Sequence, residues 1–158
     1  MSAKREFADT LQRANVEHAY YYIITHKRIF EASEIHFMNQ QYRSAVLDSF
    51  IELENMIKEK TNYPKDNRGR ELMGVSLMRE VFNLNKPLLK WNSLRTQTQI
   101  DEYEGYSHIF AGVMQGIRNP KAHRRFKQTP MRALQLLVIA NLLAEIVDQS
   151  VYISSNLV

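Results

Sequence analysis

The chain has 158 residues, 44% of them hydrophobic, which is enough for one domain to bury a core without disulfides or metal ions. It has no cysteine, which excludes disulfides, thiolate zinc sites and cysteine nucleophiles and favours a reducing cytoplasm. The formal charge of +4 permits a polyanionic partner but does not by itself argue for one.

Neither export nor membrane insertion is expected. Residues 1–12 include basic side chains, but no apolar run of the kind found in signal peptides follows them. The longest apolar stretch, residues 134–147, contains Gln135, Asn141 and Glu145 and falls short of the ~20 residues that cross a bilayer. The sequence therefore predicts a cytoplasmic protein with no membrane partner.

Residues 1–36 are expected to form a helical extension before a helical domain at residues 37–158. Phe7, Leu11 and Ala14 follow helical spacing, whereas residues 20–25, YYYIIT, are rich in strand formers. The tyrosines of this run could stack on bases, but packing in a core or an interface is the commoner use of such residues.

The clearest helical pattern lies between residues 40 and 60. Its apolar residues recur at three- and four-residue steps and share one helical face: Tyr42, Val46, Phe50, Leu53 and Ile57. Turn formers cluster between residues 62 and 69, so this helix is expected to end near Thr61.

Three further elements follow in the order of the chain. A short helix is expected over residues 75–82, an irregular connection over 83–98, and a third main helix from Asp101 to Ile117. Small residues on that helix would allow close packing against a neighbour: Gly105, Ala111, Gly112 and Gly116. The last helix, about 131–150, is apolar on nearly every side, so we expect it to be central and shared with a second subunit.

A strongly basic segment separates the last two helices. Between residues 118 and 127 it contains no acid and has these basic residues: Arg118, Lys121, Arg124, Arg125 and Lys127. Pro120 lacks an amide donor and disfavours a helical Asn119, so a turn or kink is expected there. Such a break would let Arg118 and His123 point into one cleft.

Arg118 and His123 offer the chemistry that phosphodiester cleavage needs. A guanidinium forks onto phosphate oxygens, and a histidine exchanges a proton near neutral pH. The 2′-hydroxyl of RNA is an internal nucleophile, so a base, an acid and charge stabilisation suffice without a metal ion. The alternative is a basic loop that caps helix ends. The same spacing recurs at Arg13 and His18, where a solvated helix face is expected.

Other polar residues are open candidates. Asp48, Glu52 and Glu54 lie on the helix at residues 40–60, where one acid could orient His123, although solvated positions are the simpler expectation. A second basic group would extend a phosphate track if it folds beside the first: Lys65, Arg68 and Arg70. No metal site is expected, because metal-ligand spacing is absent at His18, His26, His36 and His108.

The string GIRNPKAH at residues 116–123, with its flanking helices EYEGYSHIFAGVMQ and MRALQLLVIANLLAEIVDQS, resembles the motif region of the HEPN superfamily. The resemblance is to the Ymh-like branch, found among bacterial and phage-defence proteins, and it covers roughly residues 37–150. The superfamily hallmark is an arginine followed closely by a histidine, here Arg118-x4-His123, and Asn119 occupies the frequently polar position beside the arginine.

This resemblance implies an all-α helical bundle that dimerises through its motif-bearing and C-terminal helices, so that two copies of Arg118 and His123 share one cleft. It also implies a metal-independent endoribonuclease without cofactors, a toxin or antiviral effector with a possible antitoxin or defence-system partner. Catalytic roles then fall to Arg118, His123 and Asn119, and RNA binding to Lys121, Arg124, Arg125 and Lys127.

Two alternatives stay open. The chain could be a non-catalytic RNA-binding or assembly module, or a partner-binding subunit of a defence system, because a fold can be kept while its chemistry is lost. In members paired with nucleotidyltransferase antitoxins, a tyrosine two residues after the histidine is modified. Arg125 stands there in this chain, so that regulation is not expected.

Overall fold

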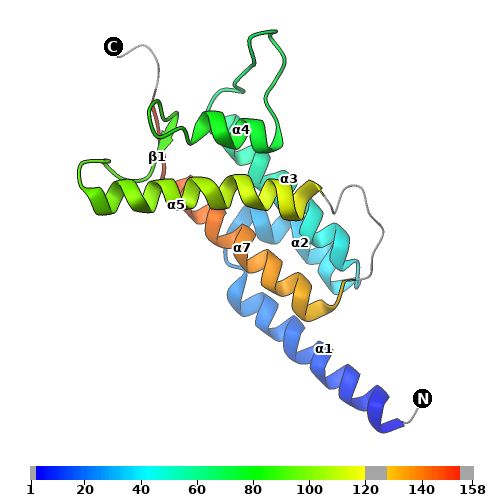
Figure 1. Ribbon diagram of the computed structural model, residues 1–158. Helices are drawn as coiled ribbons and strands as arrows, with labels where there is room; N and C mark the ends of the chain where they lie inside the picture. Colours follow the sequence, from blue (N-terminus) through cyan, green and yellow to red (C-terminus); the bar gives the residue numbers. More distant parts are fainter. Residues whose placement is uncertain (1–2, 120–127, 154–158) are drawn as a thin grey trace.

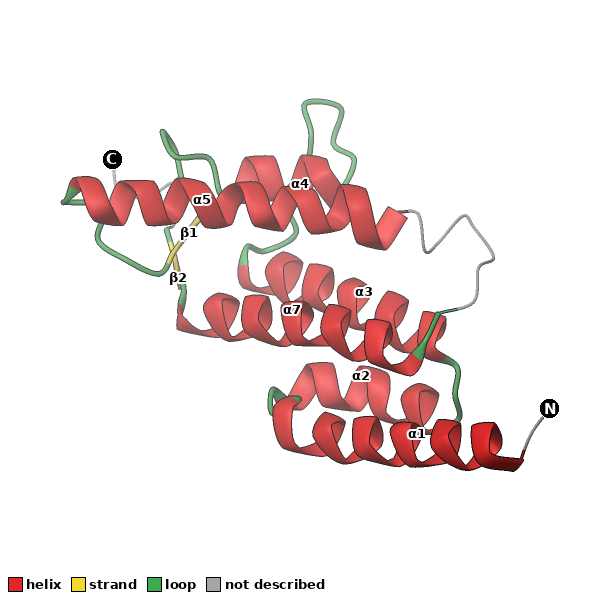
Figure 2. Cartoon of the chain, turned by 60° about the horizontal axis from the view of Figure 1, so that its bottom comes forward, coloured by secondary structure: helices red, strands yellow, loops and turns green. Residues whose placement is uncertain are grey.

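The structure is an all-α bundle, as predicted. The computed structural model describes residues 3–119 and 128–153, with side chains from Asp9 onward. Its α-helices are α1 (Ala3–Ile23), α2 (Lys27–Met38), α3 (Tyr42–Lys60), α4 (Gly74–Val81), α5 (Gln97–Val113) and α7 (Pro130–Gln149). They stack in three layers, with α4 and α5 on one side, α3 and α7 in the middle, and α1 and α2 on the other side (Figures 1 and 2).

The helices expected over residues 40–60, 75–82 and 131–150 are confirmed to within two residues at each end. After α3, Asn62 and Tyr63 adopt positive φ angles of 55° and 54°, which a continuing helix does not allow. α7 starts with Pro130 in its first turn, and the Thr129 hydroxyl accepts a hydrogen bond from the Arg132 backbone N–H at 3.2 Å.

The strand-rich run near the amino terminus is helical up to Ile23, because burial outweighs intrinsic propensity there. Tyr20 is fully buried, stacks on Phe37 with ring centroids 4.6 Å apart, and shares a 2.8 Å hydrogen bond with the Ser33 hydroxyl. Tyr21 and Tyr22 are exposed. α1 and α2 thus contribute to the same core as the later helices, and the expected boundary at residue 37 stays a prediction.

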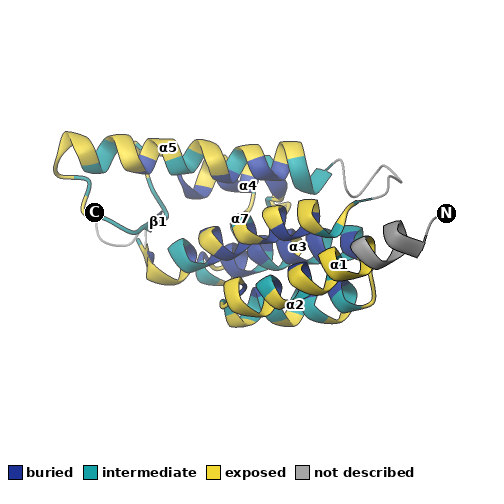
Figure 3. Ribbon diagram, turned by 90° about the horizontal axis from the view of Figure 1, so that it is seen from below, coloured by how far each residue is buried: buried dark blue, intermediate teal, exposed yellow. Residues whose placement is uncertain are grey.

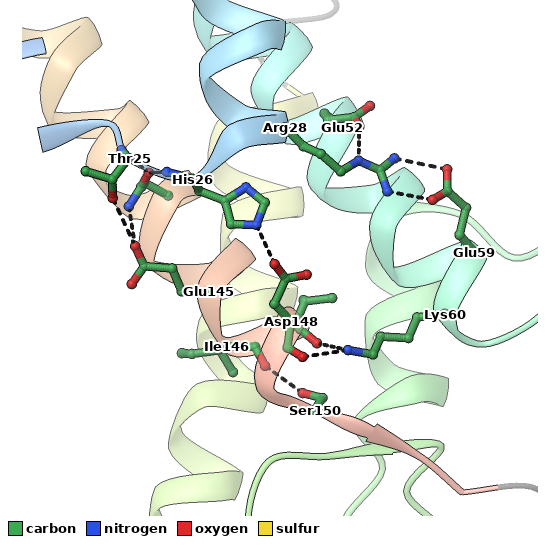
Figure 4. A network of polar contacts seen from close by, with 12 residues as sticks. Thr25, His26, Arg28, Glu52, Glu59, Lys60, Glu145, Ile146, Asp148 and Ser150 are labelled. Atoms are coloured by element: carbon green, nitrogen blue, oxygen red, sulfur yellow. Dashed lines mark hydrogen bonds and ion pairs between the residues drawn. The ribbon is translucent and has the colours of Figure 1, made fainter. Parts of the chain in front are cut away.

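The turn between α1 and α2, which Figure 4 shows at Thr25 and His26, is held by a side chain of α7. The Asn141 amide oxygen, on α7, accepts hydrogen bonds from the backbone N–H groups of Thr25 (3.0 Å) and His26 (2.8 Å). These donors precede α2 and have no partner within that helix. Nearby, Lys60 donates to the carbonyls of Val147 and Asp148 at the end of α7.

α5 begins four residues before the expected start at Asp101, because Thr96 and Gln99 form a reciprocal capping box. The connection before it contains a strand that was not expected, β1 (Leu89–Lys90). It pairs antiparallel with β2 (Val151–Tyr152), which follows α7. This pairing joins segments far apart in the chain, so no local pattern could indicate it.

α7 is central, as expected, and packs against α1, α2 and α3 (Figure 3). Of the described residues, it is the one helix long and apolar enough to cross a membrane. The apolar stretch 134–147 was expected to be too short to cross a bilayer. The helix that contains it has 20 residues, so this argument from length was wrong. Half of the membrane-length window is buried inside the protein, which is typical of a core helix.

The glycines of α5 do not pack closely against another helix in this chain. A Cβ added at Gly105, Gly112 or Gly116 would meet no atom of the described residues within 4 Å. Gly105 and Gly112 are exposed on α5, and Gly116 is exposed just beyond it. The expected close approach of a neighbouring helix is therefore not made within the described part of the chain.

Candidate functional site

The predicted arginine lies on an irregular turn that prolongs α5. A π-helix, η1 (Met114–Arg118), follows α5, and the Asn119 N–H donates to the Met114 carbonyl five residues back. Asn119 stays helical at φ −64° and ψ −47°, so the expectation that Pro120 would disfavour this conformation was wrong. Such π-turns occur frequently at functional sites. η1 contacts α3 and α4, which brings Arg118 against the middle layer.

The Arg118 guanidinium is partly buried, with 21% of the side chain exposed. Its Nη1 donates to the Asn119 side-chain oxygen at 3.2 Å. Its Nη2 lies 3.6 Å from Glu54 Oε2 on α3, which is an ion pair but too long for a hydrogen bond. Arg118 Nε is buried and has no hydrogen-bond partner among the described residues.

Glu54 is a buried acid at the centre of a chain of charges. Only 2% of the residue is exposed, and its Oε1 pairs with Lys58 Nζ at 3.2 Å. Lys58 in turn pairs with Glu71 at 2.9 Å, in the loop before α4. Burial lowers the pKa of Lys58, but the hydrogen bonds to Glu71 and Glu54 outweigh it, so the pKa lies above its usual value. Arg118, Glu54, Lys58 and Glu71 therefore form one alternating series of charges.

The three candidate acids of α3 have different ion-pair partners in the structure. Asp48 pairs with His36 at 3.0 Å, and Glu52 pairs with Arg28. Glu54 alone of the three is paired with Arg118 in the described structure. The sequence contained a signal for this, because Glu54 follows Phe50 by four residues and therefore lies on the apolar face of the helix. An acid at such a position needs a buried partner.

The other half of the predicted site is not described. His123 and the predicted RNA-binding residues Lys121, Arg124, Arg125 and Lys127 fall between residues 120 and 127, outside the described part of the chain. The convergence of Arg118 and His123 in one cleft therefore stays a prediction. Arg118 and Asn119 are described, and they contact each other.

A cavity of about 480 Å³ lies between α4 and α5. Arg79 and His108 contribute to its lining, and so does Gln115, three residues before Arg118. The ion pair of Arg118 and Glu54 lies outside this cavity, so the charged cluster and the cavity are separate features. Among the described residues, no group of three or more His, Cys, Asp or Glu side chains could hold a metal ion.

Comparison with known proteins places the chain in a family. A family model described as "Protein of unknown function (Hypoth_ymh)" matches residues 24–147, well over half of the chain. The chain belongs to this Ymh family. The Ymh match includes Glu54, Lys58, Glu71 and Arg118, and it begins just before α2. No curated protein and no solved structure matches the chain.

Proposed function

We propose that this Ymh-family protein is a metal-independent endoribonuclease of the HEPN superfamily, with Arg118, His123 and Asn119 in its active site. The observation that carries the proposal is the state of Arg118. It is partly exposed, lies on a π-turn and is held 3.6 Å from a buried carboxylate, a contact too long to occupy a donor in a hydrogen bond. A guanidinium has five N–H donors, so it keeps donors for phosphate oxygens.

The reaction uses the 2′-hydroxyl of RNA as nucleophile. His123 accepts the proton of that hydroxyl, and the 2′-oxygen forms a bond to phosphorus. The bond from phosphorus to the 5′-oxygen breaks, and a second copy of His123 in the homodimer protonates this leaving oxygen. The products are a 2′,3′-cyclic phosphate and a 5′-hydroxyl. Arg118 stabilises the charge that develops on the phosphate, and Asn119 braces the arginine.

Homodimerisation is part of the proposal, and two features of the fold support it. α7 lies between α5 and α1 on one face of the molecule (Figures 1 and 2), and Met131, Val138 and Leu142 are exposed on it. Gly105 and Gly112 on α5 each cost about 0.5–1 kcal/mol relative to alanine, without serving close packing in the described chain. A helix from a second copy could use that space.

The expected setting is the cytoplasm, where the protein acts as a toxin or antiviral effector. Lys121, Arg124, Arg125 and Lys127 bind the RNA backbone electrostatically, which makes binding sensitive to salt and gives little base readout. An antitoxin or another protein of a defence system would restrain the activity until it is needed.

The direct test is incubation of the purified protein with end-labelled mixed RNA in EDTA. Wild-type protein is expected to release fragments with cyclic-phosphate ends. Arg118→Ala and His123→Ala are each expected to lower the rate by at least about a thousandfold, because each removes a group that acts in the transition state. Both variants should keep the wild-type oligomeric state, measured by light scattering.

Other outcomes of this test are equally informative. Full activity in both variants would contradict the assigned site. RNA binding without any fragments, weakened modestly by the same substitutions, would favour the non-catalytic binding module instead.

A further inference from the structure

In the described part of the chain, Arg28 and Arg118 both contact acids of α3, and they are bound in different ways. Arg28 uses all three of its nitrogens: Nε donates to Glu52, and Nη1 and Nη2 donate to the two carboxylate oxygens of Glu59 at 2.6 and 3.0 Å. Figure 4 shows this fork-to-fork arrangement. An arginine bound in this way has a structural role, because few of its donors are left for a ligand.

Arg118 has the opposite arrangement. Its contact with Glu54 is a charge contact at 3.6 Å, and both Glu54 Oε2 and Arg118 Nε are buried without a hydrogen-bond partner in the described structure. A buried pair that served stability alone would satisfy these atoms, since each unsatisfied group is costly. The carboxylate therefore attracts the guanidinium without occupying its donors.

The Glu54 carboxylate is also held by a second contact, on the oxygen that does not face Arg118. Lys58, one turn further along α3, contacts the second carboxylate oxygen, and Glu71 contacts Lys58. Glu54 is thus buried, anchored on a long helix and restrained by a neighbouring cation. A carboxylate held in this way can fix the position of the Arg118 side chain, which comes from a distant segment of the chain.

We propose that Glu54 is a positioning residue that orients the Arg118 guanidinium, so that its free donors face the scissile phosphate of RNA. Glu54 touches no reacting atom and acts through Arg118. This inference rests on the proposed ribonuclease function. It adds to the Arg118 and His123 pair a third residue, from a helix far away in the sequence.

The test compares Glu54→Gln with Glu52→Gln, a matched control that removes an arginine partner from the same helix. In Glu54→Gln, kcat for RNA cleavage is expected to fall about 10- to 100-fold with little change in KM, because a misplaced group mainly affects the transition state. Glu52→Gln is expected to cleave like wild type. In an Arg118→Ala background, Glu54→Gln should cause no further loss.

The inference would be overturned if folded Glu54→Gln cleaved RNA at the wild-type rate. It would also be overturned if Glu54→Gln lowered kcat by the same factor in the Arg118→Ala background as in the wild-type background. If Glu54→Gln does not fold because Lys58 loses one of its two carboxylate partners, the double variant Glu54→Gln with Lys58→Met carries the same comparison. A merely structural role would lower the denaturation midpoint and leave the kcat of the folded enzyme unchanged.

A second measurement separates this inference from the proposed function. The effects of Glu54→Gln and Arg118→Ala on urea unfolding are expected to be non-additive, whether or not RNA is cleaved. Additive effects would overturn the inference. Non-additive effects in a wild-type protein that does not cleave RNA would contradict only the ribonuclease assignment.

Discussion

Asn141 shows how a single polar residue determines the path of a distant part of the chain. It is buried on a mostly apolar helix, and its side-chain oxygen accepts hydrogen bonds from two backbone N–H groups just before α2. Its amide nitrogen donates to Glu145 one turn further on. All of its polar atoms therefore have partners, which allows the residue to be buried.

Asn141→Ala is expected to lower the free energy of unfolding by about 1–3 kcal/mol, because it leaves backbone donors unsatisfied in a part-buried turn. Denaturant unfolding followed by circular dichroism measures the change. Gln135→Ala, on the exposed side of α7, should stay within about 0.5 kcal/mol of wild type. Equal stability of the two variants would show that Asn141 does not cap α2.

At the scale of elements, the loop between α3 and α4 is an ordered basic turn. The Asp66 carboxylate accepts hydrogen bonds from the backbone N–H groups of Arg68 and Arg70 and from the Arg70 side chain. These hydrogen bonds lower the pKa of Asp66. Lys65 and Arg68 are exposed, and no ion pair to them is found among the described residues. Glu71, at the end of the loop, joins it to the charge series of Arg118.

On the prediction that this loop extends the phosphate track of the proposed site, Lys65→Ala with Arg68→Ala is expected to weaken binding of single-stranded RNA several-fold. The salt dependence of binding should flatten by about 0.7 in log–log slope for each lost phosphate contact. The measurement is fluorescence titration at several salt concentrations in a His123→Ala background, which removes cleavage.

A matched control removes one lysine and one arginine from another loop of the protein. Lys86 and Arg95 are exposed in the connection between α4 and α5, outside the loop between α3 and α4. Alanine at both positions should leave RNA affinity nearly unchanged. If both double variants weaken binding equally, the loop carries only a general charge effect.

At the scale of the whole molecule, the face formed by α5, α7 and α1 is the contact surface of the proposed dimer. Leu142→Glu places a charge in the apolar part of this face and is expected to convert the proposed dimer into a monomer. Light scattering over a dilution series measures this change. RNA cleavage should be lost with the dimer, because the shared cleft is then incomplete.

Ile35→Glu is the control for this substitution, since Ile35 is also an exposed apolar residue but lies on α2. This variant should keep the wild-type oligomeric state and activity. A wild-type protein that is monomeric at micromolar concentration would contradict the proposed dimer.

The sequence by itself determined the helices with strong periodicity. The apolar residues of α3 and α7 recur at helical spacing, and this spacing depends only on contacts within one or two turns. The turn formers after Thr61 marked the end of α3 for an equally local reason. The sequence also singled out Arg118 and Asn119, which the structure brings into contact.

Only the tertiary structure decided which distant residues meet. The burial of Tyr20, the pairing of β1 with β2, and the capping of α2 by Asn141 all depend on how separate helices dock. The same holds for the selection of Glu54, rather than Asp48 or Glu52, as the partner of Arg118. Periodicity places a side chain on a face of its helix, but its partner comes from an element whose position is set by the packing of the whole core.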